Sequence, residues 1–297
     1  MKRALIVGID AYPRAGDRLQ GAAGDARRMK ERLFAKHGFD ETSTLHLVNG
    51  EATRGAILDG LGWLTSGTAR GDTCVFYYSG HGSVMPDKDG DEEDGTDECL
   101  CPVDFRTAGK IADDELARMY AKAAPGCRLT LIMDCCHAGD IQKANTHVLG
   151  YRRLDPTEDE GDAISAATML YRADRDAFTA PILAAHGGLS ASERERLVKE
   201  AYQRFAESRV KPVVIANKER CVLVAACPPK LLSAEAVIDG QPQGVLTSHL
   251  LAALDQLGPG VSAQSVFETT ARLIASAHFL PAPRLEGRPE NLALPLF

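Results

Sequence analysis

The chain has 297 residues, 44% of them hydrophobic and 25% charged, with a formal net charge of −7. This composition is typical of a globular protein with a sizeable core, and the acidic total argues against a nucleic-acid binder that works through a basic face. The apolar run before Asp10 is too short for a signal peptide, and no run approaches the roughly 20 apolar residues of a membrane span. We therefore expect a cytoplasmic protein with no nucleic-acid or membrane partner.

The first 140 residues alternate between strand-like and helix-like segments. Continuous apolar runs predict buried strands at residues 4–9, 74–79 and 127–133. Helical spacing and end signals predict a helix over 22–36 ended by Gly38, a second capped by Thr53 and running to about 64, and a third opening at Asp113 or Asp114. This alternation predicts an α/β fold with a mostly parallel sheet.

Residues 141–212 interrupt that alternation, because they are rich in charged and small residues and contain no run typical of a strand. One helix is predicted there, where a capping box formed by Ser190 and Glu193 precedes apolar residues at helical spacing. The alternation resumes with a predicted strand over 221–226 and helices over 245–257 and 262–276. The segment 141–212 is therefore either an insertion or a linker.

Two of the predicted strands end in residues that can carry chemistry. One is followed by Gly80-His81-Gly82 and the other by Cys135-Cys136. Active sites of open α/β sheets lie beyond the carboxyl ends of the strands, so an imidazole and a thiol would meet there if the strands are neighbours. That pair could perform nucleophilic catalysis, although a lone histidine or cysteine at a strand end is more often structural.

The sequence Tyr-Ser-Gly-His-Gly at 78–82, followed by Asp-Cys-Cys-His-Ala-Gly at 134–139, resembles the caspase-like cysteine peptidases of clan CD, and among them the metacaspases and orthocaspases. The resemblance covers residues 2–140 and extends more loosely to the chain after 221. It implies a caspase-like three-layer sandwich in one overall domain. Residues 1–140 would form its large-subunit-like catalytic half, 141–212 a linker or processing region, and 213–297 its small-subunit-like half.

The resemblance also implies a catalytic pair, His81 and Cys136, with the backbone amides of Gly82 and Cys136 as the oxyanion hole. Cys135 stands where the family usually has serine. Neighbouring side chains on a strand point to opposite faces, so the two thiols are not expected to share a role. We therefore expect a cysteine endopeptidase, a thiol protease of the peptidase C14 type, with Cys136 as its nucleophile.

Three further residues, Asp25, Ser79 and Asp134, match those that line the primary substrate pocket of metacaspases. Paired carboxylates in a partly dry pocket repel each other and are relieved by a guanidinium or ammonium group. The resemblance therefore implies protein or peptide substrates that are cut after Arg or Lys. The alternative is that Asp25 is a charge in the first turn of its helix and Asp134 a cap at the end of its strand.

Residues 87–98 hold eight acids and one lysine, so this loop accounts for the whole net charge. The resemblance implies a calcium site with Asp97, Asp113 and Asp114 as ligands. Asp140 could replace a further family carboxylate at the position of Lys143. No organic cofactor is expected. The alternative to a calcium site is a solvated acidic loop.

Basic residues in 141–212, among them Arg152 and Arg153, offer sites that the enzyme itself could cut. We therefore interpret the chain as a zymogen that is activated by cleavage of the linker, by itself or by an upstream protease, by calcium, or by both. A passive insertion is the alternative.

Two other functions stay open, a non-catalytic caspase-like interaction module and a zinc-binding protein. The candidate zinc ligands would be Cys99, Cys101, Cys135, Cys136 and His137.

Overall fold

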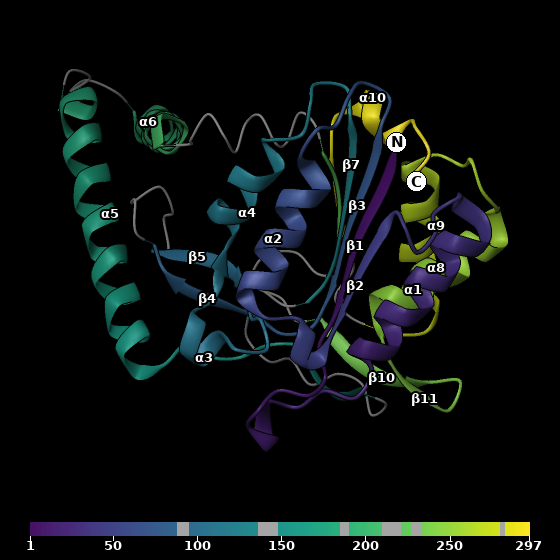
Figure 1. The fold of residues 1–297 in the computed structure, drawn as a ribbon. Coiled ribbons are helices and arrows are strands. Elements are labelled where there is room, and N and C mark those ends of the chain that lie inside the picture. Colours follow the sequence, from purple (N-terminus) through teal and green to yellow (C-terminus); the bar gives the residue numbers. More distant parts are fainter. Residues whose placement is uncertain (88–94, 136–147, 185–189, 210–220, 227–232, 280–282) are drawn as a thin grey trace.

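The computed structural model describes residues 1–297 except 88–94, 136–147, 185–189, 210–220, 227–232 and 280–282. A six-stranded sheet with the order β12-β9-β7-β3-β1-β2 lies at its centre (Figure 1). Its strands are β1 (Lys2–Gly8), β2 (Thr44–Val48), β3 (Thr73–Ser79), β7 (Arg128–Asp134), β9 (Cys221–Ala225) and β12 (Arg284–Glu286). All neighbouring strands are parallel except β12, which runs antiparallel to β9. The predicted mostly parallel sheet is thus confirmed.

Helices cover both faces of this sheet, and together they form three layers (Figure 1). One face carries α2 (Arg54–Thr65), α3 (Phe105–Ala108) and α4 (Asp113–Tyr120), and the other carries α1 (Ala22–His37), α8 (Val245–Leu257) and α9 (Ala263–Ser276). Each face of the sheet has its own hydrophobic core. Alternate residues of one strand belong to the two cores, because successive side chains point to opposite faces. In β1, for example, Leu5 and Val7 belong to the core under α2, and Ile6 belongs to the core under α1.

Local end signals set several helix boundaries where the sequence predicts them. The Thr53 side chain accepts a hydrogen bond from the backbone N–H of Ala56 at the start of α2. Gly38 ends α1 with a φ of 69°, a left-handed conformation that glycine adopts without strain. In the linker region, the backbone N–H of Ser190 donates to Glu193 and the Glu193 N–H donates to the Ser190 hydroxyl, at the start of α6 (Ala191–Arg209).

Two predictions for residues 141–212 are wrong. The segment contains a strand, β8 (Val148–Tyr151), which pairs antiparallel with β10 (Ala234–Ile238), and β10 also pairs with β11 (Gln241–Gly244). It also contains a second helix, the 27-residue α5 (Glu158–Ala184). The strand is short and its partner lies far along the chain. The helix has only Tyr171 and Thr179 among its buried residues, so its sequence lacks the apolar periodicity that predicts a helix.

A second three-stranded sheet follows His81 directly and consists of β4 (Gly82–Pro86), β5 (Thr96–Leu100) and β6 (Ile111–Ala112). Helix α5 runs along the outer side of β4 and β5, at the left of Figure 1, with α6 packed against it. The chain also forms short helices at Ala15–Asp17, Asn49–Glu51 and Pro289–Leu292. Among the helices of the described residues, none combines the length and the apolarity that a membrane crossing requires.

Candidate active site

The strands β1, β3 and β7 end level with one another at the carboxyl edge of the central sheet. Gly8 pairs with Ser79, and Ser79 pairs with Asp134. The two strands that precede the histidine and the cysteine pair are therefore neighbours, as the catalytic reading of the sequence requires. Cys136, two residues beyond Asp134, lies outside the described residues.

Hydrogen bonds to its backbone hold His81 in place. Its N–H donates to the hydroxyl of Tyr12 at 2.9 Å, and its carbonyl accepts from the hydroxyl of Tyr78 at 2.9 Å and from the N–H of Cys101 at 3.0 Å. The ring centroids of Tyr12 and His81 are 4.9 Å apart. Both tyrosines are fully buried, so they position the histidine through a rigid part of the core. The sequence analysis did not single out either tyrosine for this role.

The hydrogen bond of the His81 ring shows which of its two nitrogens carries the proton. Its Nε2 lies 2.7 Å from the backbone carbonyl oxygen of Asp17. A carbonyl can only accept a hydrogen bond, so Nε2 carries the proton and donates it, and Nδ1 keeps its lone pair. Nδ1 is buried and has no hydrogen-bond partner among the described residues. Burial lowers the pKa of His81 to about 4, which keeps the ring neutral and Nδ1 available as a base.

The three predicted pocket residues surround one guanidinium group, that of Arg152. Arg152 Nη2 lies 2.5 Å from Asp25 Oδ2, and Nη1 lies 2.6 Å from Ser79 Oγ and 3.2 Å from Asp134 Oδ2. Asp25 comes from α1, Ser79 from the end of β3 and Asp134 from the end of β7. All four side chains are fully buried. The structure thus brings the predicted pocket residues together around a basic side chain of the chain itself.

Asp134 is fixed by residues of the last 85 positions of the chain. Its Oδ1 accepts from the Ser233 hydroxyl at 2.9 Å, and its Oδ2 accepts from the N–H and the hydroxyl of Thr247 at 3.0 and 2.6 Å. Asp25 Oδ2 accepts from the N–H of Gly244 at 2.9 Å. These donors hold the two carboxylates in one geometry around the guanidinium of Arg152.

The charge of Asp134 influences the protonation of Asp25. The pKa of Asp25 is raised to about 6, first by burial and also by the charge of Asp134, whereas Arg152 and Arg28 act against this rise. Arg28, one turn further along α1, forms an ion pair with Asp25 Oδ1. A cation in the pocket therefore stabilises the ionised form of Asp25, as expected for two carboxylates that share a dry site.

A third carboxylate, that of Glu235, also faces the guanidinium and was missed by the sequence analysis. Glu235 is 2% exposed, and its Oε2 lies 3.4 Å from Arg152 Nη2. Its two oxygens accept from the backbone N–H groups of Gln20 and Gly21 at 2.9 and 3.0 Å. The sequence does contain a sign of this residue, because β10 has the sequence Ala-Glu-Ala-Val-Ile. A single acid within such an apolar strand is expected to be buried and paired with a cation.

Gly244 closes the pocket with its backbone. A Cβ atom at this position would lie 2.2 Å from Asp134 Oδ2 and 2.5 Å from Arg152 Nη1. No side chain fits there without displacing the carboxylate or the guanidinium, so this glycine is required by a close approach. The sequence analysis did not assign Gly244 to the site.

The backbone on both sides of Arg152 lies across the site in an extended form. The N–H of Gly82, a predicted oxyanion-hole donor, donates to the carbonyl oxygen of Arg152 at 3.0 Å. The N–H of Arg152 donates to the carbonyl of Ser233 at 3.1 Å, and the N–H of Leu154 donates to the carbonyl of Gly82 at 3.0 Å. Strand β8, just before Arg152, adds to the edge of β10, so this segment is bound in the way that β-strand addition binds a peptide.

The predicted calcium ligands are only partly described. Asp97 is buried on β5, and Asp113 begins α4, where it accepts a hydrogen bond from the N–H of Asp114 at 2.9 Å. The pKa of Asp113 is raised to about 8 by desolvation at the start of α4 and by the charges of Glu98 and Asp97, although part of the residue is exposed. Asp140 lies outside the described residues.

Among the described residues, no three His, Cys, Asp or Glu side chains are arranged to hold a metal ion. Calcium takes about six to eight oxygen ligands, so the described acids alone do not complete such a site. Of the candidate zinc ligands, Cys136 and His137 lie outside the described residues. Cys135 is 1% exposed and packs in the core under α2, where it behaves as a small apolar side chain.

Comparison with known proteins identifies relatives of the chain. Residues 2–144 match the family model described as "Metacaspase, peptidase C14 domain". The chain is 29% identical over 263 residues to Metacaspase-1 of Coccidioides immitis, covering 85% of this chain and 54% of the relative. It is 30% identical to Metacaspase-1A of Aspergillus clavatus over the same length, which is 58% of that relative. Metacaspase-1 of Cryptococcus neoformans is 39% identical over 145 residues, or 46% of this chain and 32% of the relative.

The chain thus spans from about a third to less than two thirds of these relatives' own length. The fold is shared over nearly the whole chain with a solved structure. A protein from Geobacter sulfurreducens superimposes with a TM-score of 0.61 at 23% sequence identity, covering 98% of this chain and 96% of that protein. At this identity, the likeness establishes a common fold.

Proposed function

Because the chain belongs to the metacaspases, a family of caspase-like cysteine peptidases of the C14 type, we propose that it is an endopeptidase that cleaves after Arg or Lys. The observation that carries this specificity is the fully buried Arg152 among the carboxylates of Asp25, Asp134 and Glu235. A neutral side chain in that pocket would leave buried carboxylates unpaired. Sites built on such polar pairing reject substrates without the partner by up to about 10⁴-fold.

In the proposed reaction, Cys136 is the nucleophile, a role that rests on the family motif. Its thiol proton passes to Nδ1 of His81, and the thiolate attacks the carbonyl carbon of the residue in the pocket. The N–H of Gly82 donates to the oxygen that becomes negative. The carbon–nitrogen bond then breaks, His81 gives its proton to the leaving amine, and a thioester remains. Water, deprotonated by His81, hydrolyses the thioester to release the acid and the thiol.

We further propose that the described form is the uncleaved precursor and that the bond between Arg152 and Arg153 is its processing site. Support comes from the path of the linker, because the Arg152 side chain fills the acidic pocket and its carbonyl accepts from Gly82. One pocket cannot hold two basic side chains, so an external substrate has to wait until this segment leaves. Cleavage after Arg152 removes the covalent link that keeps the segment in place.

Two measurements test this function together. Fluorogenic peptides that differ only in the residue before the cleaved bond should be cut when it is Arg or Lys and not when it is Asp. N-terminal sequencing of fragments of the purified chain should find a new terminus at Arg153, and Cys136→Ala should remain intact. Faster cleavage after Asp than after Arg would reject the pocket assignment.

Substitutions at the processing site supply matched controls. Arg152→Lys should keep the new terminus at residue 153, whereas Arg152→Gln should remove it. Arg153→Gln should have little effect, because the Arg153 side chain pairs with Asp155 rather than with the pocket. A fully active chain that stays intact on a gel would contradict the precursor proposal and leave the specificity proposal standing.

A further inference from the structure

A cavity of about 390 Å³ lies beside the proposed cleavage site, on the side that follows the cleaved bond. Its lining includes Asp155 and Thr157, which are the third and fifth residues after Arg152. Leu154, the second residue, is tied to the carbonyl of Gly82 through its N–H. The chain therefore leads directly from the proposed catalytic groups into this cavity, which neither the family motifs nor the proposed reaction uses.

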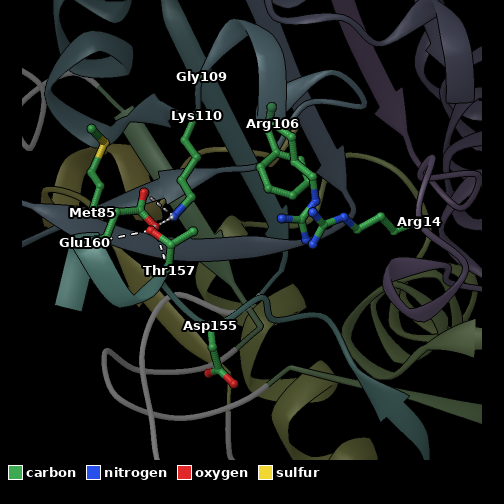
Figure 2. A pocket seen from close by; sticks show the side chains of 9 residues that line it. Arg14, Met85, Arg106, Gly109, Lys110, Asp155, Thr157 and Glu160 are labelled. Atoms are coloured by element: carbon green, nitrogen blue, oxygen red, sulfur yellow. Dashed lines mark hydrogen bonds and ion pairs between the residues drawn. The ribbon is translucent and has the colours of Figure 1, made fainter.

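Three basic and two acidic side chains line the cavity. Figure 2 shows Arg14 and Arg106 on one side and Lys110 with Glu160 on the other, while Asp155 lies apart from both groups. Arg106 Nη2 pairs with Asp17 Oδ2 at 2.8 Å, and Lys110 Nζ lies 2.9 and 3.0 Å from the two oxygens of Glu160.

The Arg14 side chain, in contrast, has no ion pair or hydrogen bond among the described residues, and the residue is exposed. Asp155 does not neutralise it, because the Asp155 side chain is 83% exposed and pairs with Arg153 Nη2 at 2.9 Å. The cavity therefore holds one uncompensated positive charge. Because the chain does not neutralise the charge of Arg14, that guanidinium is available to an acidic group of a substrate.

We propose that this cavity is a substrate subsite that accepts an acidic side chain at the third or fifth residue after the cleaved bond. The inference rests on the proposed function, because it assumes that a substrate follows the path of residues 152–157. A carboxylate that enters the cavity would pair with the Arg14 guanidinium through charge-assisted hydrogen bonds. Glu160, the eighth residue after Arg152, already places a carboxylate against Lys110 on the other side of the cavity, so the cavity accommodates acidic side chains.

The expected selectivity is modest, because Arg14 is exposed and water screens its charge. We expect a roughly threefold to tenfold preference for an acidic over a basic residue, which is the range of a surface ion pair together with the matching repulsion. The preference should shrink as salt is added, since exposed charges are screened over about 10 Å at 0.1 M ionic strength. A preference that survives high salt would point to a cause other than Arg14.

The test uses internally quenched peptides that carry Arg before the cleaved bond and differ only at the third and fifth residues after it. These two residues are both Glu, both Gln or both Lys, and kcat/KM is measured with the full chain. We expect the Glu peptide to be cut fastest and the Lys peptide slowest. Arg14→Glu should reverse that order without loss of fold, because the Arg14 side chain contributes no contact to the core. Arg27→Glu is the matched control, since Arg27 is exposed on α1, on the opposite face of the sheet, and should leave the order unchanged.

The outcomes separate this inference from the proposed function. Equal cleavage of all three peptides, or an unchanged order in Arg14→Glu, overturns the subsite and leaves cleavage after Arg intact. If no peptide is cut, the proposed function fails, and binding decides the subsite. Fluorescence anisotropy of the same peptides on the Cys136→Ala, Arg152→Gln chain should then give tighter binding for the Glu peptide, and addition of Arg14→Glu should abolish that difference. Equal dissociation constants would overturn the subsite.

Discussion

The acidic pocket and the cationic cavity lie on opposite sides of one peptide bond, and they differ most in their burial. In the pocket, Arg152 and Asp25 are both fully buried, and their charges are 2.5 Å apart. In the cavity, Arg14 is exposed and Asp155 is 83% exposed. A buried charge without its partner costs several kcal/mol, whereas an exposed ion pair contributes about 1 kcal/mol or less. We therefore expect the pocket to select substrates strongly and the cavity to select them weakly.

The two regions also differ in how their charges are held. Asp134 receives hydrogen bonds from Ser233 and Thr247, and Asp25 receives one from the backbone of Gly244. Arg14 has no such support among the described residues. A charge that is already oriented loses little entropy when a substrate binds. We therefore expect the pocket to bind a cation more tightly, and in a more defined geometry, than the cavity binds an anion.

The largest expected effect concerns the proposed nucleophile. Cys136→Ala should abolish cleavage of Arg peptides and self-processing, because no other group can form the thioester. Cys135→Ala is the matched control. Cys135 is a core residue, so its loss should lower the free energy of unfolding by about 1 kcal/mol and spare kcat. The opposite pattern in the peptide assay would exchange the roles of the two thiols.

The next largest effect should come from the pocket acids. Asp134→Asn should reduce kcat/KM for Arg peptides by about 10²- to 10³-fold, because it leaves a basic side chain short of a buried partner. Glu235→Gln should reduce kcat/KM roughly 10-fold, since Glu235 Oε2 lies 3.4 Å from the guanidinium and the variant keeps an amide oxygen for one of the two backbone donors. Equal losses of kcat/KM in the two variants would show that the distance between the acid and the guanidinium does not set the size of the effect.

A smaller effect is expected in the pH dependence of stability. The pKa of His81 is about 4 in the folded chain, below the ordinary value of 6.5. Between these values the unfolded chain binds a proton that the folded chain does not, so the contribution of His81 to stability falls as the pH falls from 6.5 toward 4. The difference between these two pKa values corresponds to a change of roughly 3 kcal/mol in the free energy of unfolding.

The raised pKa of Asp25 has the opposite effect, because its proton binds to the folded chain up to about pH 6. Because the two effects oppose each other, the measurement compares the loss of stability of wild type with that of a variant without His81. Urea unfolding of wild type and His81→Gln at pH 7 and pH 4 should show that wild type loses more stability than the variant on acidification. Equal losses in the two proteins would contradict the burial assigned to His81 as the cause of its lowered pKa.

The smallest expected effect concerns calcium, which stays a prediction. Asp97, Glu98 and Asp113 crowd their negative charges near one place, and a divalent cation would relieve that repulsion. Calcium should raise the melting temperature of wild type and not that of Asp113→Asn, because a ligand stabilises only a fold that binds it. An unchanged melting temperature and unchanged activity after strong chelation would favour the solvated acidic loop.

Local sequence signals predicted those parts of the fold that depend on neighbouring residues. Thr53 caps the start of α2 and Gly38 the end of α1, and apolar runs place β3 and β7 in the sheet. Helix α5 was missed because its exposed surface removes the apolar periodicity that marks a helix. Strand β8 was missed because its stability comes from pairing with β10, about 85 positions further along the chain.

The candidate site divides in the same way. The sequence alone, through its motif, determined which strand ends carry His81, Ser79 and Asp134, since a strand fixes the place of the residues that follow it. Only the tertiary structure decided that Arg152 fills the pocket, that Glu235 faces it and that Gly244 closes it. The contacts of Arg152 and Gly244 with Asp25 span 127 and 219 positions. Contacts over such separations leave no periodic pattern in the sequence, because they depend on how whole layers pack and not on any local preference of the chain.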